Sequence, residues 1–125
     1  MRPTIMPRTA LALFLLAASS VAAHATEKPV WRLDSVIATA VRGGVQVQVK
    51  GAVRSGGWSH ARLKLSHSDA HSIVLEFLAQ PPAANTLVIQ GLIPVSAQVT
   101  VKAGPGVTSV RVEGDANTVT AQILR

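Results

Sequence analysis

Three of the four histidines and one of the two tryptophans of this chain lie in one stretch, SGGWSHARLKLSHSDAH, residues 55–71. Neutral imidazole is a common ligand of transition metals, and a carboxylate can complete such a site. The stretch could therefore hold a divalent ion, form a binding loop, or be the polar turns of an ordinary β-domain. The elements that carry these residues decide which side chains can meet.

The chain beyond residue 25 alternates apolar and polar residues, which is typical of half-buried strands. The alternation is clearest in VQVQVKGAVR (45–54) and VSAQVTVKA (95–103), and no stretch repeats apolar residues at the helical spacing. Strands are expected at residues 30–40, 45–54, 61–67, 72–79, 86–93, 95–103, 108–113 and 118–124. About seven or eight short strands predict an all-β fold, an antiparallel β-sandwich of the immunoglobulin-like general architecture. Phe77 is expected to be the large core side chain.

Turn residues suggest how neighbouring strands pair. A three-residue loop, 42–44, keeps the apolar faces of the first two long strands together and places Leu33 opposite Val53. Pro94 is expected to end a strand, because proline cannot donate a hydrogen bond to a ladder. The last strand, 118–124, has few charges and is expected at a sheet edge, where a second copy of the chain could pair with it.

The histidines are placed by the hairpin formed by residues 61–67 and 72–79. If residues 68–70 form its loop, His67 lies directly across from His71. A register shifted by two residues, which pairs Lys64 with Glu76, is the alternative.

Facing side chains of a hairpin lie about 5 Å apart, so His67 and His71 could share a divalent ion, with Asp69 as a third ligand. His60 cannot join them, because it lies at the other end of the strand, about 20 Å away. The competing interpretation is a polar, exposed turn, and it is preferred.

The other end of this hairpin offers a surface for a protein partner. The candidate partner-binding residues are Gly56, Gly57, Trp58 and His60, because exposed tryptophans often anchor interfaces. The loop that follows residues 72–79 should emerge at the same end, since the two strands are antiparallel neighbours. In the preferred alternative, Trp58 folds over the end of the core and packs on Pro81 or Pro82.

Residues 1–25 have the pattern of a signal peptide. Arg2 and Arg8 form a basic region, ALALFLLAA (10–18) an apolar run, and Ala23-His24-Ala25 a small-x-small cleavage site. The apolar run is shorter than the roughly 20 residues that span a bilayer, so no membrane span is expected. We expect one exported domain, residues 26–125, in the periplasm or secreted.

Composition and motif spacing argue against catalysis. The six acidic residues are scattered, and Gly104-Pro105-Gly106 precedes a strand and not a helix, so neither an acid/base pair nor a phosphate loop is expected. The chain has no cysteine, so no disulfide can hold the domain together. The net charge of +6 falls to +4 without Arg2 and Arg8. Without an arginine-rich tract, nucleic acid is an improbable partner.

The sequence therefore predicts a non-catalytic binding or assembly module that needs no cofactor. Its partner would be another exported protein or a component of the cell envelope. The alternatives are a periplasmic metal-binding protein that uses His67 and His71, or an inhibitor or ligand of another exported protein that acts through the Trp58 loop.

Overall fold

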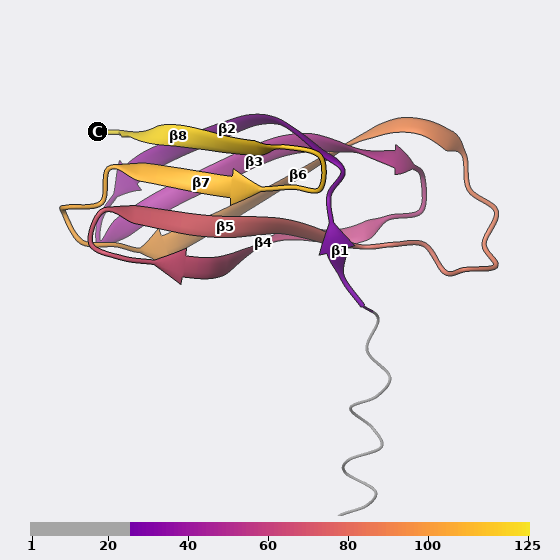
Figure 1. Ribbon diagram of the computed structural model, residues 1–125, viewed down its shortest axis with the longest axis horizontal. Helices are drawn as coiled ribbons and strands as arrows, with labels where there is room; N and C mark the ends of the chain where they lie inside the picture. The colour runs from indigo at the N-terminus through magenta and orange to yellow at the C-terminus, as the bar shows by residue number, and fades with distance from the viewer. Residues whose placement is uncertain (1–25) are drawn as a thin grey trace, which may run out of the picture.

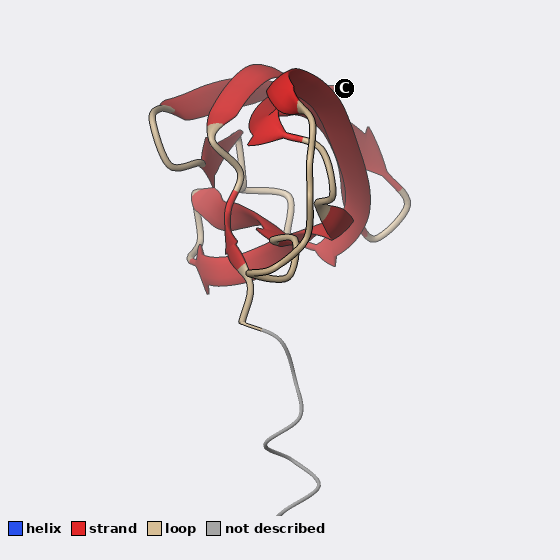
Figure 2. Ribbon diagram, turned by 90° about the vertical axis from the view of Figure 1, so that its right-hand side faces the viewer, coloured by secondary structure: helices blue, strands red, loops and turns tan. Residues whose placement is uncertain are grey.

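The computed structural model describes residues 26–125, which fold into β-strands and contain no helix (Figures 1 and 2). The predicted signal peptide, residues 1–25, lies outside the described residues. The strands in chain order are β1 (Lys28–Pro29), β2 (Arg32–Val41), β3 (Gly44–Ser55), β4 (Ser59–Ser68), β5 (Ser72–Gln80), β6 (Gln90–Lys102), β7 (Ser109–Glu113) and β8 (Thr118–Leu124). The all-β prediction is confirmed.

The strands form one curled, open sheet in the order β1-β5-β7-β8-β2-β3-β6, and β4 pairs with the other edge of β5. Among the described residues, β6 pairs only with β3 and β4 only with β5, so each keeps one edge without a strand partner. Figure 2 shows the sheet curling round on itself. The sheet is mixed, because β2 pairs with β8 and β5 with β7 in parallel, so the purely antiparallel prediction is wrong. The connection 103–108 brings the chain back to the start of β5, where Thr108 N donates to His71 O, and β7 therefore runs alongside β5 in the same direction.

The turn between β2 and β3 has two residues, Arg42 and Gly43, where three were predicted. Val41 pairs with Gly44, and Gly43 has φ +77°. Tight hairpins need such positive φ angles, which glycine adopts without a steric penalty. The three-residue loop was predicted in order to keep both apolar faces inward along the whole hairpin. That prediction is wrong because the residues of β2 that face the core change from odd-numbered to even-numbered positions partway along the strand.

The parity changes at a β-bulge at Asp34, where the register shifts between Leu33 and Ser35. Leu33 and Ala38 are both buried although one is odd-numbered and the other even-numbered, and Ile37 is turned outward. Leu33 pairs with Gly51, not with Val53 as predicted. The bulge thus fixes how the residues before β2 lie against β3.

The core lies inside the curl of the sheet, and Phe77 is its largest fully buried side chain, as predicted. Nearly all the buried positions are aliphatic, and each large side chain contributes roughly 1.5–3 kcal/mol relative to exposure. The largest fully buried side chains besides Phe77 are Val30, Val47, Val49, Val53, Ile73, Leu75, Val110 and Val112. With no cysteine in the chain, this apolar packing and the strand ladders hold the domain together.

Two expectations about individual strands are wrong. Residues 90–102 form the single strand β6, which runs through Pro94, whereas two strands separated at Pro94 were predicted. Proline is tolerated there because β6 is an edge strand. β8 lies between β7 and β2, so residues 118–124 are not the edge strand that was predicted. Because residues 26–125 form no helix, none in this part of the chain is long and apolar enough to cross a membrane.

Candidate functional site

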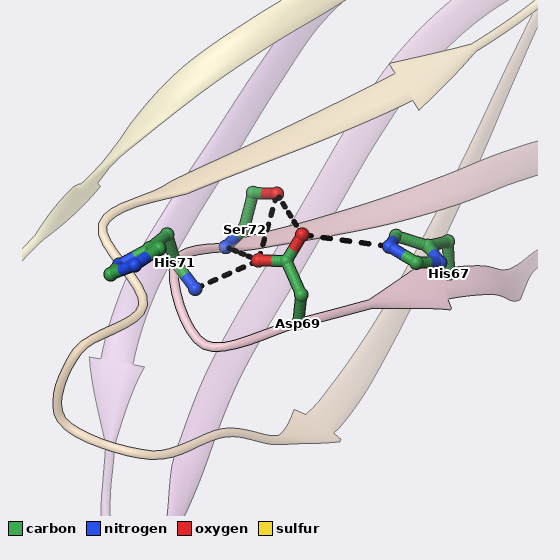
Figure 3. A network of polar contacts seen from close by, with 4 residues as sticks. All are labelled: His67, Asp69, His71 and Ser72. Atoms are coloured by element: carbon green, nitrogen blue, oxygen red, sulfur yellow. Dashed lines mark hydrogen bonds and ion pairs between the residues drawn. The ribbon is translucent and has the colours of Figure 1, made fainter.

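The turn between β4 and β5 is organised by the carboxylate of Asp69 (Figure 3). Its Oδ1 accepts hydrogen bonds from the backbone N–H of His71 at 2.8 Å and of Ser72 at 2.9 Å. These bonds, with a smaller contribution from His67, hold the pKa of Asp69 below its ordinary value. Asp69 thus forms an Asx turn, a local role that its residue type favours.

The β4–β5 hairpin adopts the register in which Lys64 pairs with Glu76, which is the alternative considered from the sequence. A bulge between Leu65 and His67 then places His67 opposite Val74. The predicted pairing of His67 with His71 is therefore wrong. The adopted register is the physical reason, because with Lys64 opposite Glu76 His67 would already face Ile73, and the bulge moves it one residue further, to Val74.

The two imidazole rings of this turn lie on opposite sides of Asp69 (Figure 3). His67 Nε2 lies 3.5 Å from Asp69 Oδ2, whereas the ring of His71 points away. Across residues 26–125, no three side chains of His, Cys, Asp or Glu gather as metal ligands. The register that the shared ion required is not adopted, and metal binding by these residues stays a prediction.

The glycine–tryptophan loop, residues 55–58, lies at the other end of the hairpin. Gly56 N donates to Ile89 O at 2.8 Å, so this loop and the connection after β5 do emerge at the same end, as predicted. Gly57 has φ +89°, and a Cβ there would lie 2.9 Å from Pro82 Cβ and 3.0 Å from Val88 Cγ1. The loop therefore needs glycine at this position to pack against its neighbour.

Trp58 and His60 follow this loop in different environments. Trp58 is partly buried and packs against the core, in keeping with the interpretation in which it covers the end of the core. His60 is exposed, and its Nδ1 lies 3.0 Å from Ser59 Oγ. Its φ of +55° is unusual for a residue other than glycine and stores backbone strain.

An exposed apolar cluster at this end was missed by sequence reasoning. Leu87 exposes 96% of its surface, Ile89 75% and Leu92 53%, and we call these three residues the apolar tip. Leu87 and Ile89 lie on the connection between β5 and β6, which projects from the end of the sheet in Figure 1, and Leu92 lies near the start of β6. A strand was predicted over 86–93, which would have buried alternate side chains. One signal was available, because the segment 77–101 contains no charged residue.

Beside the same loop lies a small cavity of about 220 Å³, which we call the tryptophan pocket. Its lining residues come from β1, β3 and three connections: Lys28, Pro29, Trp31, Arg54, Trp58 and Asp115. Both tryptophans of the chain therefore line one pocket. Such a concave, partly apolar surface with a few polar groups is a common form of ligand site.

The segment before β2 is fixed in place from two directions. The bulge at Asp34 pairs Arg32 with Ala52, which brings Trp31 beside the end of β3. Ala116 N donates to Trp31 O at 2.8 Å, which ties the β7–β8 turn to the same segment. The position of Trp31 beside Arg54 depends on this bulge, so the alternation of residue types in the sequence did not predict it.

The Arg54 guanidinium lies 5.0 Å from the centre of the Trp31 ring, and that of Arg32 lies 5.5 Å away. Both distances are within cation–π range. Arg32 also binds Asp34 at 2.8 Å. Within residues 26–125, neither Arg54 nor Lys28 has a carboxylate partner. The pocket thus holds two uncommitted cations next to two indole rings.

The chain matches no protein-family model, no curated protein and no solved structure in the comparisons made. The chemistry of its own surface is therefore what supports an interpretation. That surface has three parts at one end of the domain: the glycine–tryptophan loop, the apolar tip and the tryptophan pocket.

Proposed function

We propose that this chain is an exported, non-catalytic β-sandwich protein of the immunoglobulin-like general kind. In this proposal it is a binding module in the periplasm or outside the cell, and its partner is another exported protein or a component of the cell envelope. Export is supported by the basic region, apolar run and small-x-small motif of residues 1–25. The sandwich is supported by the way the sheet curls around one core.

The apolar tip is the observation that carries the proposal. Apolar side chains left exposed close together on a folded surface mark sites of interaction, and the three residues of the apolar tip fall within positions 87–92. Leu87 and Ile89 are displayed on a connection that is held in place by the bond from Gly56 N to Ile89 O. Burying each of these side chains against a partner would contribute roughly 1.5–3 kcal/mol before the cost of association is subtracted.

The described acidic residues support a non-catalytic role. Glu27 binds Arg62 through both carboxylate oxygens at 2.6 Å, and Glu113 binds Arg111 at 3.0 Å. The bonds from Arg62 lower the pKa of Glu27. A carboxylate whose pKa is lowered in this way, as that of Glu27 is, is poorly suited to general acid catalysis near neutral pH.

The experiment that tests the proposal is site-specific photo-crosslinking in living cells that export the full chain. A photoreactive residue is placed at Leu87, and a matched one at Arg42, in the exposed turn between β2 and β3. We expect a discrete adduct from position 87 that position 42 does not give. The captured protein is then identified, purified and titrated against the wild-type chain.

The affinity of the variants for that partner distinguishes specific binding from nonspecific hydrophobic association. We expect the double variant Leu87→Asn, Ile89→Asn to bind at least tenfold more weakly. Leu124→Asn is the matched control, because Leu124 is also an exposed leucine but lies at the end of β8. Equal affinities of the double variant and the wild type would refute the proposal, as would identical adducts from positions 87 and 42.

A further inference from the structure

The arginines of the domain differ in whether a carboxylate side chain already pairs with them. Arg32, Arg62 and Arg111 each bind a carboxylate at 2.6–3.0 Å. Arg54 binds none in the described part of the chain, and its guanidinium is stacked near the Trp31 ring. Stacking restricts the guanidinium plane, so less side-chain entropy is lost when it binds an anion.

Lys28 adds a second uncommitted cation to the lining of the tryptophan pocket. Its place is fixed by the pairing of β1 with β5, in which Lys28 lies opposite Ala79. A fork-shaped guanidinium and an ammonium that line one cavity favour an anion, and the planar fork can bind both oxygens of a carboxylate. Two cations and one carboxylate, that of Asp115, line the pocket, so its charge favours an anionic group such as a carboxylate.

The other walls of the pocket select an apolar group beside that carboxylate. Trp31, Trp58 and Pro29 supply the apolar lining, and Trp58 is backed by the core. Asp115 supplies one hydrogen-bond acceptor, and the backbone bond from Asp115 N to Val30 O holds its turn in place. A ligand that satisfies all three features carries a carboxylate, an apolar group and an N–H donor close together.

The size of the pocket limits how much of a ligand can enter. Its volume of about 220 Å³ is below the roughly 300–1,000 Å³ of drug-sized sites. It can therefore accept a single residue at the end of a longer molecule. The last residue of a peptide combines a carboxylate, an apolar side chain and an amide N–H within that size.

We propose that the tryptophan pocket binds the carboxyl-terminal residue of a peptide chain whose last side chain is apolar. In this assignment Arg54 and Lys28 bind the terminal carboxylate, the indole rings pack on the side chain, and Asp115 accepts the amide N–H. The inference rests on the proposed function, because it names the part of the protein partner that enters this end of the domain.

The test uses the exported chain and the peptide N-acetyl-Ala-Ala-Leu with a free carboxyl end. The same peptide with an amidated end is the comparison. Intrinsic fluorescence reports on the pocket directly, since both tryptophans line it and the chain has no tyrosine. Calorimetry in parallel gives the affinity independently of the indole signal. We expect saturable binding of the acid and at least tenfold weaker binding of the amide.

Arg54→Gln should weaken binding of the acid at least tenfold, because it removes the charge and the fork of donors. Arg111→Gln is the matched control, since Arg111 lies on β7 and is paired with Glu113. Arg111→Gln should bind the peptide as the wild type does. Both residues are exposed, so neither change is expected to disturb the fold.

Four results would overturn the inference. The first two are equal binding of the acid and the amide, and no binding of the acid at millimolar concentration. The third is wild-type affinity of Arg54→Gln for the acid. The fourth is binding of digalacturonate in place of the peptide, which would assign the pocket to an acidic sugar. Failure of this inference can be distinguished from failure of the proposed function. If the captured partner still depends on Leu87 and Ile89 but not on Arg54, only the peptide-end assignment falls.

Discussion

Replacing Gly51 by alanine tests the packing between β2 and β3 that places Trp31. A Cβ at residue 51 would lie 2.1 Å from Arg32 O, 3.2 Å from Arg32 C and 3.4 Å from Leu33 Cα. All three atoms belong to the backbone, so no change of side-chain rotamer can relieve the overlap. The two strands would have to move apart by about 1 Å to restore an ordinary contact, and the bulge at Asp34 lies directly beside them.

The size of the effect follows from this overlap. Forcing extra atoms into a well-packed site costs typically 1–3 kcal/mol, and a clash with backbone belongs at the upper end of that range. We therefore expect Gly51→Ala to lower the free energy of unfolding by about 3 kcal/mol. For a domain of about 100 residues, that corresponds to a drop in Tm of more than about 10 °C.

Urea unfolding followed by circular dichroism gives the free energy of unfolding directly. Gly104→Ala is the matched control, because a Cβ there meets nothing within 4 Å and the residue has no positive φ. We expect the control to stay within about 0.5 kcal/mol of the wild type. Wild-type stability of Gly51→Ala would show that Leu33 does not lie against Gly51, and the account of how Trp31 reaches the pocket would fail with it.

Three further predictions concern the turn, the loop and the N-terminal segment. The lowered pKa of Asp69 in the folded protein contributes stability above its unfolded value of about 3.9, and this contribution is lost as the pH falls through the folded pKa. Asp69→Asn should therefore have a lower Tm than the wild type at pH 7, with the difference shrinking below pH 4; a constant difference would contradict this. His60→Gly should retain or slightly raise stability, whereas His60→Val should lose about 1–2 kcal/mol in urea unfolding, because the φ of +55° is strained for a branched side chain. Equal stabilities of these two variants would contradict that reasoning. Mass spectrometry of the exported protein should show an N-terminus at Thr26, and an intact Met1 in that fraction would contradict the predicted export signal.

The alternation of apolar and polar residues was enough to predict an all-β domain and most of its strands. It could not show where the alternation changes phase. One bulge at Asp34 and another between Leu65 and His67 shift the parity of β2 and β4, and no residue type at those places announces them. Together with the two-residue turn after β2 and the shifted register of the β4–β5 hairpin, these bulges replaced the predicted pairings of Leu33 with Val53 and of His67 with His71.

Long-range placement was also beyond the reach of local patterns. The parallel pairing of β5 with β7 depends on the path of the connection 103–108, which ends with Thr108 bonded to His71. The approach of Arg54 to Trp31 depends on the bulge in β2. The glycines and the tryptophan of the Trp58 loop predicted a candidate partner surface there, whereas the place of Trp31 in the tryptophan pocket and the exposure of the apolar tip emerged only from the structure.

The central claim is that the end of the domain carrying Trp58 and the apolar tip is a binding surface. The most direct measurement is the dissociation constant of the complex with the partner captured at Leu87. It is compared among the wild type, the double variant Leu87→Asn, Ile89→Asn and the control Leu124→Asn. We predict at least a tenfold weaker complex for the double variant and an unchanged one for Leu124→Asn. The claim would be contradicted by an unchanged dissociation constant for the double variant, or by equal weakening in the double variant and in Leu124→Asn.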